Sequence, residues 1–83
     1  MTIDENWTVD PRRVCDFFAG LPGAVKTGDG FILDGCQVTL TPVEGMVMGK
    51  WPLRRTRIRI HGEDSAVDAL YQKFFLRFLS AGG

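Results

Sequence analysis

The most distinctive chemical pattern in the sequence is a row of basic side chains in residues 54–61, RRTRIRIH. If this stretch is a β-strand, Arg55, Arg57, Arg59 and His61 share one face, because side chains alternate between the two faces of a strand. Guanidinium groups match the geometry of carboxylate and phosphate oxygens, so the row could bind an anionic partner. The alternative is a solvated face whose charges discourage pairing between sheet edges.

The segment PVEGMVMGKW, residues 42–51, is the second candidate contact surface. It resembles part of a phosphate-binding loop, but three residues rather than four separate its glycines, and Trp51 stands where a Mg²⁺-binding hydroxyl is needed. We therefore reject that function. Methionine is adaptable and tryptophan is frequent at interfaces, so Met48, Lys50 and Trp51 are candidate binding residues. The same segment could instead fold over the end of the core.

Catalytic residues are harder to find. His61 lies close in sequence to Glu63 and Asp64, a combination that can serve acid–base chemistry or a weak metal site, but acidic residues ahead of a helix are more simply explained by its positive end. Cys15 and Cys36 fall at positions expected to face the core, and two cysteines with a single histidine cannot form a four-ligand zinc site. We expect no enzyme activity, no metal and no cofactor.

The segments that would position these residues begin with a short helix. Asp10 is placed to cap it and Pro11 to open it, while Gly20 and Pro22 would end it. Apolar residues at helical spacing give it one core-facing side: Val14, Phe17, Phe18 and Leu21.

Residues 25–40 predict three short strands separated by the turn sequences GDG and DG. A two-residue turn at residues 34–35 aligns the apolar residues of two strands on one face. A three-residue turn at residues 28–30 would place Lys26 on the opposite face beside Ile32. That opposite face would carry Lys26, Ile32, Gln37, Thr39, Thr41 and the arginine row.

Residues 42–51 contain prolines and glycines and are expected to be a long connection, in which only residues 46–48 resemble a strand. Residues 54–61 form the last strand. A helix then begins near Ser65, runs to about Leu79, and turns a phenylalanine-rich side toward the sheet.

These segments predict a single small α+β domain, residues 1–83, in the order α-β-β-β-(β)-β-α. The hairpins are too short for parallel crossovers, so we expect two layers: an antiparallel meander of four or five strands, with the N-terminal and C-terminal helices on one face. Residues 1–6 should be flexible and residues 80–83 frayed.

Composition limits the function. Lys plus Arg and Asp plus Glu both total 10, and the isoelectric point is about 6.5, which argues against a dedicated nucleic-acid-binding protein. Without a long apolar run or a signal-like N-terminus, a cytoplasmic protein without membrane contact is expected. We predict an interaction domain that contacts an acidic or anionic partner, either another protein or a second copy of itself, through the basic row, Lys26 and the 42–51 segment. The alternative is a small nucleic-acid-binding protein that uses the same arginines on phosphates.

Overall fold

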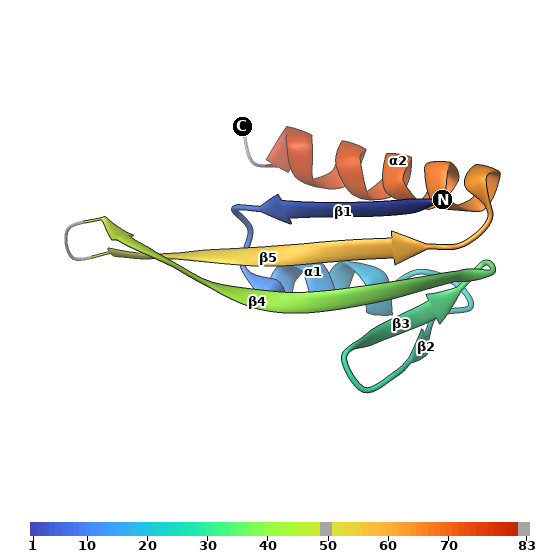
Figure 1. Cartoon of the computed structure of the whole chain (residues 1–83), viewed down its shortest axis with the longest axis horizontal. Coiled ribbons are helices and arrows are strands. Elements are labelled where there is room, and N and C mark those ends of the chain that lie inside the picture. Colours follow the sequence, from blue (N-terminus) through green and yellow to red (C-terminus); the bar gives the residue numbers. More distant parts are fainter. Residues whose placement is uncertain (49–50, 82–83) are drawn as a thin grey trace.

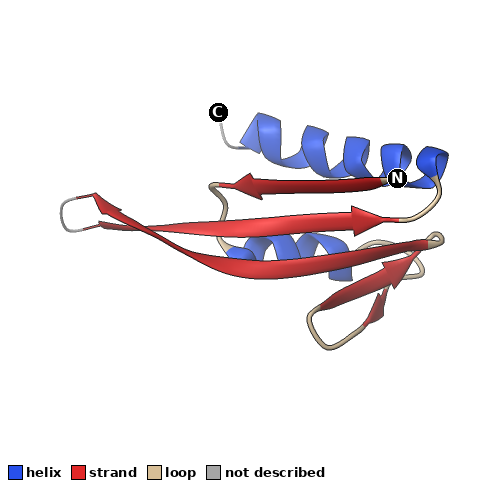
Figure 2. Cartoon of the chain, in the orientation of Figure 1, coloured by secondary structure: helices blue, strands red, loops and turns tan. Residues whose placement is uncertain are grey.

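The computed structural model describes the backbone of residues 1–48 and 51–81, and the side chains of residues 1–43 and 54–79. Over this part of the chain it shows a five-stranded antiparallel sheet and two helices, confirming the predicted α+β class (Figures 1 and 2). The strand order is β1-β5-β4-β3-β2, so the meander β2 to β5 is extended by the first strand. The elements are β1 (Thr2–Trp7), α1 (Pro11–Ala19), β2 (Val25–Lys26), β3 (Gly30–Leu33), β4 (Cys36–Met48), β5 (Trp51–His61) and α2 (Asp64–Ala81).

Helix α1 begins and ends where the sequence predicts. The Asp10 carboxylate accepts a hydrogen bond from the Arg12 backbone N–H at 2.9 Å, and Pro11 is the first helical residue. At the other end, the N–H of Gly20 donates to the carbonyl of Asp16 at 3.1 Å. Val14 and Phe18 are buried, so the helix presents its predicted apolar side to the sheet.

The β3–β4 hairpin has the predicted register. Asp34 and Gly35 both have positive φ, 50° and 74°, as a two-residue turn of this kind requires. Leu33 consequently pairs with Cys36. Phe31, Leu33, Cys36 and Val38 are buried against the helices, whereas Ile32 lies on the opposite face.

The β2–β3 turn is one residue shorter than predicted. The N–H of Thr27 donates to the carbonyl of Gly30 at 2.9 Å, which leaves a two-residue turn. Lys26 therefore pairs with Phe31 rather than lying beside Ile32, and its ammonium group is 5.2 Å from the Phe31 ring centroid. A slip of one residue moves every side chain of a strand to the other face, so the prediction that Lys26 belongs to the basic face was wrong.

Residues 2–7 form edge strand β1, where the sequence suggested a flexible end. Ile3 pairs with Ile60 and Trp7 with Thr56, both in β5. Glu5 also faces the helices, at a position where an alternating strand would carry an apolar residue. This interruption is why the sequence did not indicate a strand here. Its carboxylate accepts hydrogen bonds from the Tyr71 hydroxyl at 2.6 Å and the Trp7 indole N–H at 3.0 Å.

The expected long connection at residues 42–51 is largely strand. β4 continues to Met48 and β5 begins at Trp51, with a shift of register between Glu44 and Val47. Strand β3 pairs only with the first residues of β4, so at Pro42 one side of β4 has no neighbouring strand and proline is tolerated. The far end of this hairpin extends beyond the helices (Figure 1).

The core lies between the sheet and both helices. The Phe18 and Phe74 rings stack at 5.9 Å across the two helices, and the Thr56 hydroxyl, buried among apolar groups, donates to the Val9 carbonyl at 2.8 Å. Helix α2 continues past Leu79 to Ala81, and residues 82–83 lie outside the described part of the chain. The buried apolar side chains are Val14, Phe18, Phe31, Leu33, Cys36, Val38, Ile58, Ile60, Val67, Leu70, Phe74 and Phe78.

Candidate functional site

Both helices pack on one face of the sheet, and we call the opposite face the outer face. In β5, Thr56, Ile58 and Ile60 are buried against the helices, so the intervening basic side chains belong to the outer face, as predicted. These are Arg55, Arg57, Arg59 and His61. Arg57, Arg59 and His61 are exposed, whereas Arg55 is half-buried.

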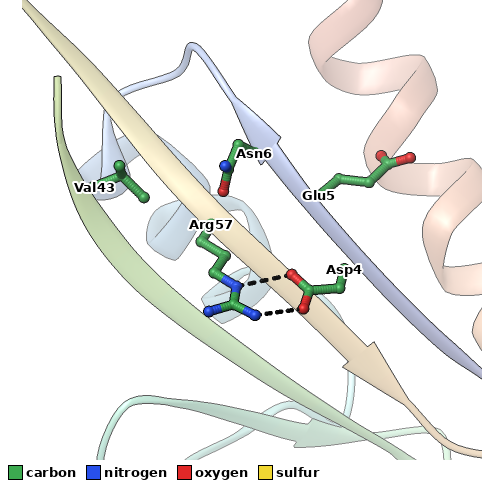
Figure 3. A pocket seen from close by; sticks show the side chains of 5 residues that line it. All are labelled: Asp4, Glu5, Asn6, Val43 and Arg57. Atoms are coloured by element: carbon green, nitrogen blue, oxygen red, sulfur yellow. Dashed lines mark hydrogen bonds and ion pairs between the residues drawn. The ribbon is translucent and has the colours of Figure 1, made fainter. Parts of the chain in front are cut away.

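Strand β1 places an acidic side chain beside this row. Both oxygens of the Asp4 carboxylate accept hydrogen bonds from Arg57, from Nε at 2.9 Å and from a terminal nitrogen at 2.6 Å (Figure 3). The hydrogen bond and charge of Arg57 hold the pKa of Asp4 below its usual value of 3.8. Figure 3 also shows Glu5 pointing toward α2, away from Arg57. The charge of Arg57 is thus compensated within the chain.

Arg59, two residues further along the same face, is in a different environment. Among the described side chains it makes no hydrogen bond or ion pair, although its charge helps to lower the pKa of Asp4. It lines a shallow recess of about 310 Å³ together with Gln37, Thr39 and His61. No acidic side chain lines this recess within the described residues, so the Arg59 guanidinium gives it a positive charge, and all four lining side chains can donate hydrogen bonds.

The His61 ring is held in place by β1. Its Nδ1 is 2.7 Å from the Thr2 hydroxyl, which leaves Nε2 as the ring nitrogen that is free to meet a ligand. A guanidinium, an imidazole, an amide and a hydroxyl therefore converge on one recess. Such a set of groups suits a carboxylate or phosphate group, whose oxygens accept hydrogen bonds.

The other end of the row is Arg55, which is half-buried, next to the exposed Arg54. Arg54 is 3.6 Å from the Asp10 carboxylate in an ion pair. Nε of Arg55 is buried and has no hydrogen-bond partner in the described structure. Arg54 lies on the helix-facing side of β5, two residues before the buried Thr56, so only Arg55 extends the outer face, and the recess is built around Arg59.

The remaining candidates from the sequence do not gather at this recess. Lys26 is on the helix-facing side of β2. Met48 and Trp51 pair at the far end of the β4–β5 hairpin, but their side chains lie outside the described residues, as does the whole of Lys50.

Asp4 and Thr2 are the residues that sequence analysis missed at this site. Both lie in the segment that was expected to be flexible, so nothing indicated that they would reach the arginine row. The only signal was the alternation of Thr2, Asp4 and Asn6 with the apolar Ile3 and Trp7.

The acidic residues after β5 serve structural roles. Asp64 forms an ion pair with the N-terminal ammonium of Met1 at 3.2 Å, and Glu63 accepts from the Ser65 hydroxyl at 3.3 Å. Cys36 is buried, and burial raises the pKa of its thiol. The described residues contain no group of three or more His, Cys, Asp or Glu side chains arranged to hold a metal ion. None of the described helices is both long and apolar enough to span a membrane.

The geometry is that of a small α+β domain with one sheet face covered by helices and the other uncovered and polar. Comparison with protein families shows that residues 5–83 match the model of the archaeal MoaD-like proteins. The chain belongs to this family. Comparisons with curated proteins and with solved structures gave no match.

Proposed function

We propose that this chain is a non-catalytic interaction domain that binds an acidic segment of a partner protein on its outer sheet face. The observation that carries the proposal is the recess around Arg59. Arg57 has an internal carboxylate partner and Arg59 has none within the described side chains, although both lie on the same strand face. A guanidinium that is not paired in the free protein is available to a partner.

Nucleic acid is less well supported as the partner. Binding along a phosphate backbone needs several free cations. Asp4 occupies Arg57 and Lys26 points to the other side of the sheet, so fewer cations are available than the sequence suggested. The zero net charge also gives no long-range attraction for a polyanion.

Affinity capture from a lysate of the source organism, with and without nuclease, tests the proposal. The double variant Arg59→Gln/His61→Gln removes the guanidinium and the imidazole of the recess. We expect a protein partner that survives nuclease treatment and whose recovery falls about tenfold or more with this variant, because a hydrogen bond to a charged group contributes roughly 1.5 to 3 kcal/mol.

The matched control is Lys73→Gln, which removes one positive charge from exposed α2 on the other side of the molecule. It should leave recovery unchanged. A partner that disappears after nuclease treatment would assign the face to nucleic acid, and a partner bound equally well by the double variant would contradict the proposal.

A further inference from the structure

We infer that the outer face recognises an amphipathic partner segment, in which an acidic side chain binds the Arg59–His61 recess and a large apolar side chain contacts Val25 and Ile32. This inference rests on the proposed function and adds the chemistry of the partner. It follows from an apolar pair that lies in line with the recess.

The alignment follows from the strand registers. Val25 pairs with Ile32, Ile32 with Gln37, and Gln37 with His61. Directly paired residues point to the same side of a sheet, so these four side chains form one row across β2, β3, β4 and β5. His61 and Gln37 line the recess, and the apolar pair continues the row from its edge.

The apolar end of the row is well exposed. Val25 is 61% exposed and Ile32 49%, while Phe31 and Leu33, on the other side of the same strand, are each 2% exposed. Isolated exposed apolar residues are common on protein surfaces. Here, however, two β-branched residues are direct neighbours beside a cluster of donors, so one ligand can contact both.

The spacing defines the partner further. Neighbouring strands are about 4.8 Å apart, which places Ile32 about 10 Å from His61 and Val25 about 15 Å from it. A segment that spans this row needs its carboxylate and its apolar side chain about 10 to 15 Å apart. The positive recess selects the acidic end, and burial of the exposed pair favours the apolar end.

Selection from a random peptide display library on the immobilised full chain tests the inference. Enriched peptides should share an acidic residue and a large apolar residue at a fixed spacing, about three residues if they bind extended and about seven if they bind as a helix. Their affinities are then measured by fluorescence polarisation against the wild type and three variants.

The variant Val25→Thr/Ile32→Thr keeps β-branched side chains and should weaken binding roughly tenfold through lost apolar contact. Arg59→Gln should weaken it at least as much. The control Leu79→Gln removes an exposed apolar side chain from α2, 55% exposed, and should have no effect.

Peptides that lose affinity with Arg59→Gln but not with the Val25/Ile32 variant would overturn the inference and leave the proposed function standing. Peptides insensitive to both variants would contradict both. A selection that enriches no sequence would also contradict the inference. So would sedimentation analysis showing that copies of the chain associate through this face and thereby block the peptides.

Discussion

Arg57 and Arg59 show how much a single neighbour changes the role of a charged residue. They are two positions apart on one strand and point to the same face, but only Arg57 donates hydrogen bonds to both carboxylate oxygens of Asp4. The carboxylate is supplied by a strand at the opposite end of the sequence. The same residue type is thus a structural partner at one position and a candidate ligand-binding group at the next.

Tyr71 offers a direct test of the contact between β1 and α2. Burial, the hydrogen bond to Glu5 and the Glu5 charge raise its pKa to about 12. Because the folded state favours the protonated phenol, this contribution to stability is present below the ordinary pKa of 10 and is lost as pH rises through about 12. It is the single tyrosine of the chain, so ultraviolet absorbance titration reports it alone.

We expect a titration midpoint near 12 in the wild type. In Glu5→Gln the midpoint should fall but stay above 10, because burial remains when the charge is removed. Circular dichroism at each pH verifies that the protein is still folded. A midpoint near 10 in the folded wild type would show that β1 does not bring Glu5 to this hydroxyl.

Gly30 begins β3 at a point where the backbone of β4 leaves no room for a side chain. A Cβ added at Gly30 would overlap the backbone carbonyl of Val38, which is fixed by its place in the sheet. Gly30→Ala should therefore lower the free energy of unfolding by about 3 kcal/mol, measured by urea denaturation. The control Gly28→Ala, in the turn just before β3 and with no atom within 4 Å of the added Cβ, should change it by less than about 0.5 kcal/mol. Equal effects at both positions would refute this packing.

At the scale of elements, α2 holds the helical layer to the sheet through Phe74. Its ring is fully buried, with centroids 4.9 Å from both Trp7 and Phe78. Phe74→Ala should lower the free energy of unfolding by about 3 to 5 kcal/mol, enough to unfold most of a domain this small. Phe75→Ala, at a position 36% exposed on the same helix, is the comparison and should cost clearly less in a thermal melt. A Phe74 variant with an unchanged melting temperature would contradict the packing of α2.

Local rules predicted some elements better than others. The Asp34-Gly35 turn has a strong sequence signal and gave the correct register. The GDG turn is compatible with two lengths, and the shorter one reversed the side on which Lys26 lies. When both residues of a two-residue strand are exposed, its hydrophobic pattern cannot decide between the two turn lengths.

Strand β1 and the extension of β4 were missed for a different reason, because both depend on distant partners. Strand β1 becomes a strand by pairing with residues of β5 that lie 49 (Trp7 with Thr56) to 59 (Thr2 with His61) positions later. Its Glu5 lies on the helix side of the sheet but remains exposed, and hydrogen bonds from Tyr71 and Trp7 hold it there. Pro42 is compatible with a strand only because no neighbouring strand lies on one side of it.

In the whole molecule, the two-layer arrangement gives the two faces of the sheet different roles. Helices α1 and α2 cover one face of the sheet (Figure 1). Their phenylalanines contribute to the core, while the outer face carries the basic row together with the exposed Val25 and Ile32. Strict alternation in β5 was sufficient to predict the basic face. It was insufficient to locate the recess, because that depends on which arginine Asp4 neutralises and on the position of β4 beside β5.

The central claim is that the outer face binds acidic protein segments at the Arg59–His61 recess. Amide chemical-shift mapping by NMR, with a glutamate homopolymer as one titrant and a single-stranded oligonucleotide as the other, tests it most directly. We expect the glutamate polymer to shift the amide resonances of Gln37, Thr39, Arg59 and His61. Arg59→Gln should abolish these changes without lowering the melting temperature. Shifts confined to the arginines of the helical side, Arg13 and Arg77, or stronger shifts of the recess with the oligonucleotide, would contradict it.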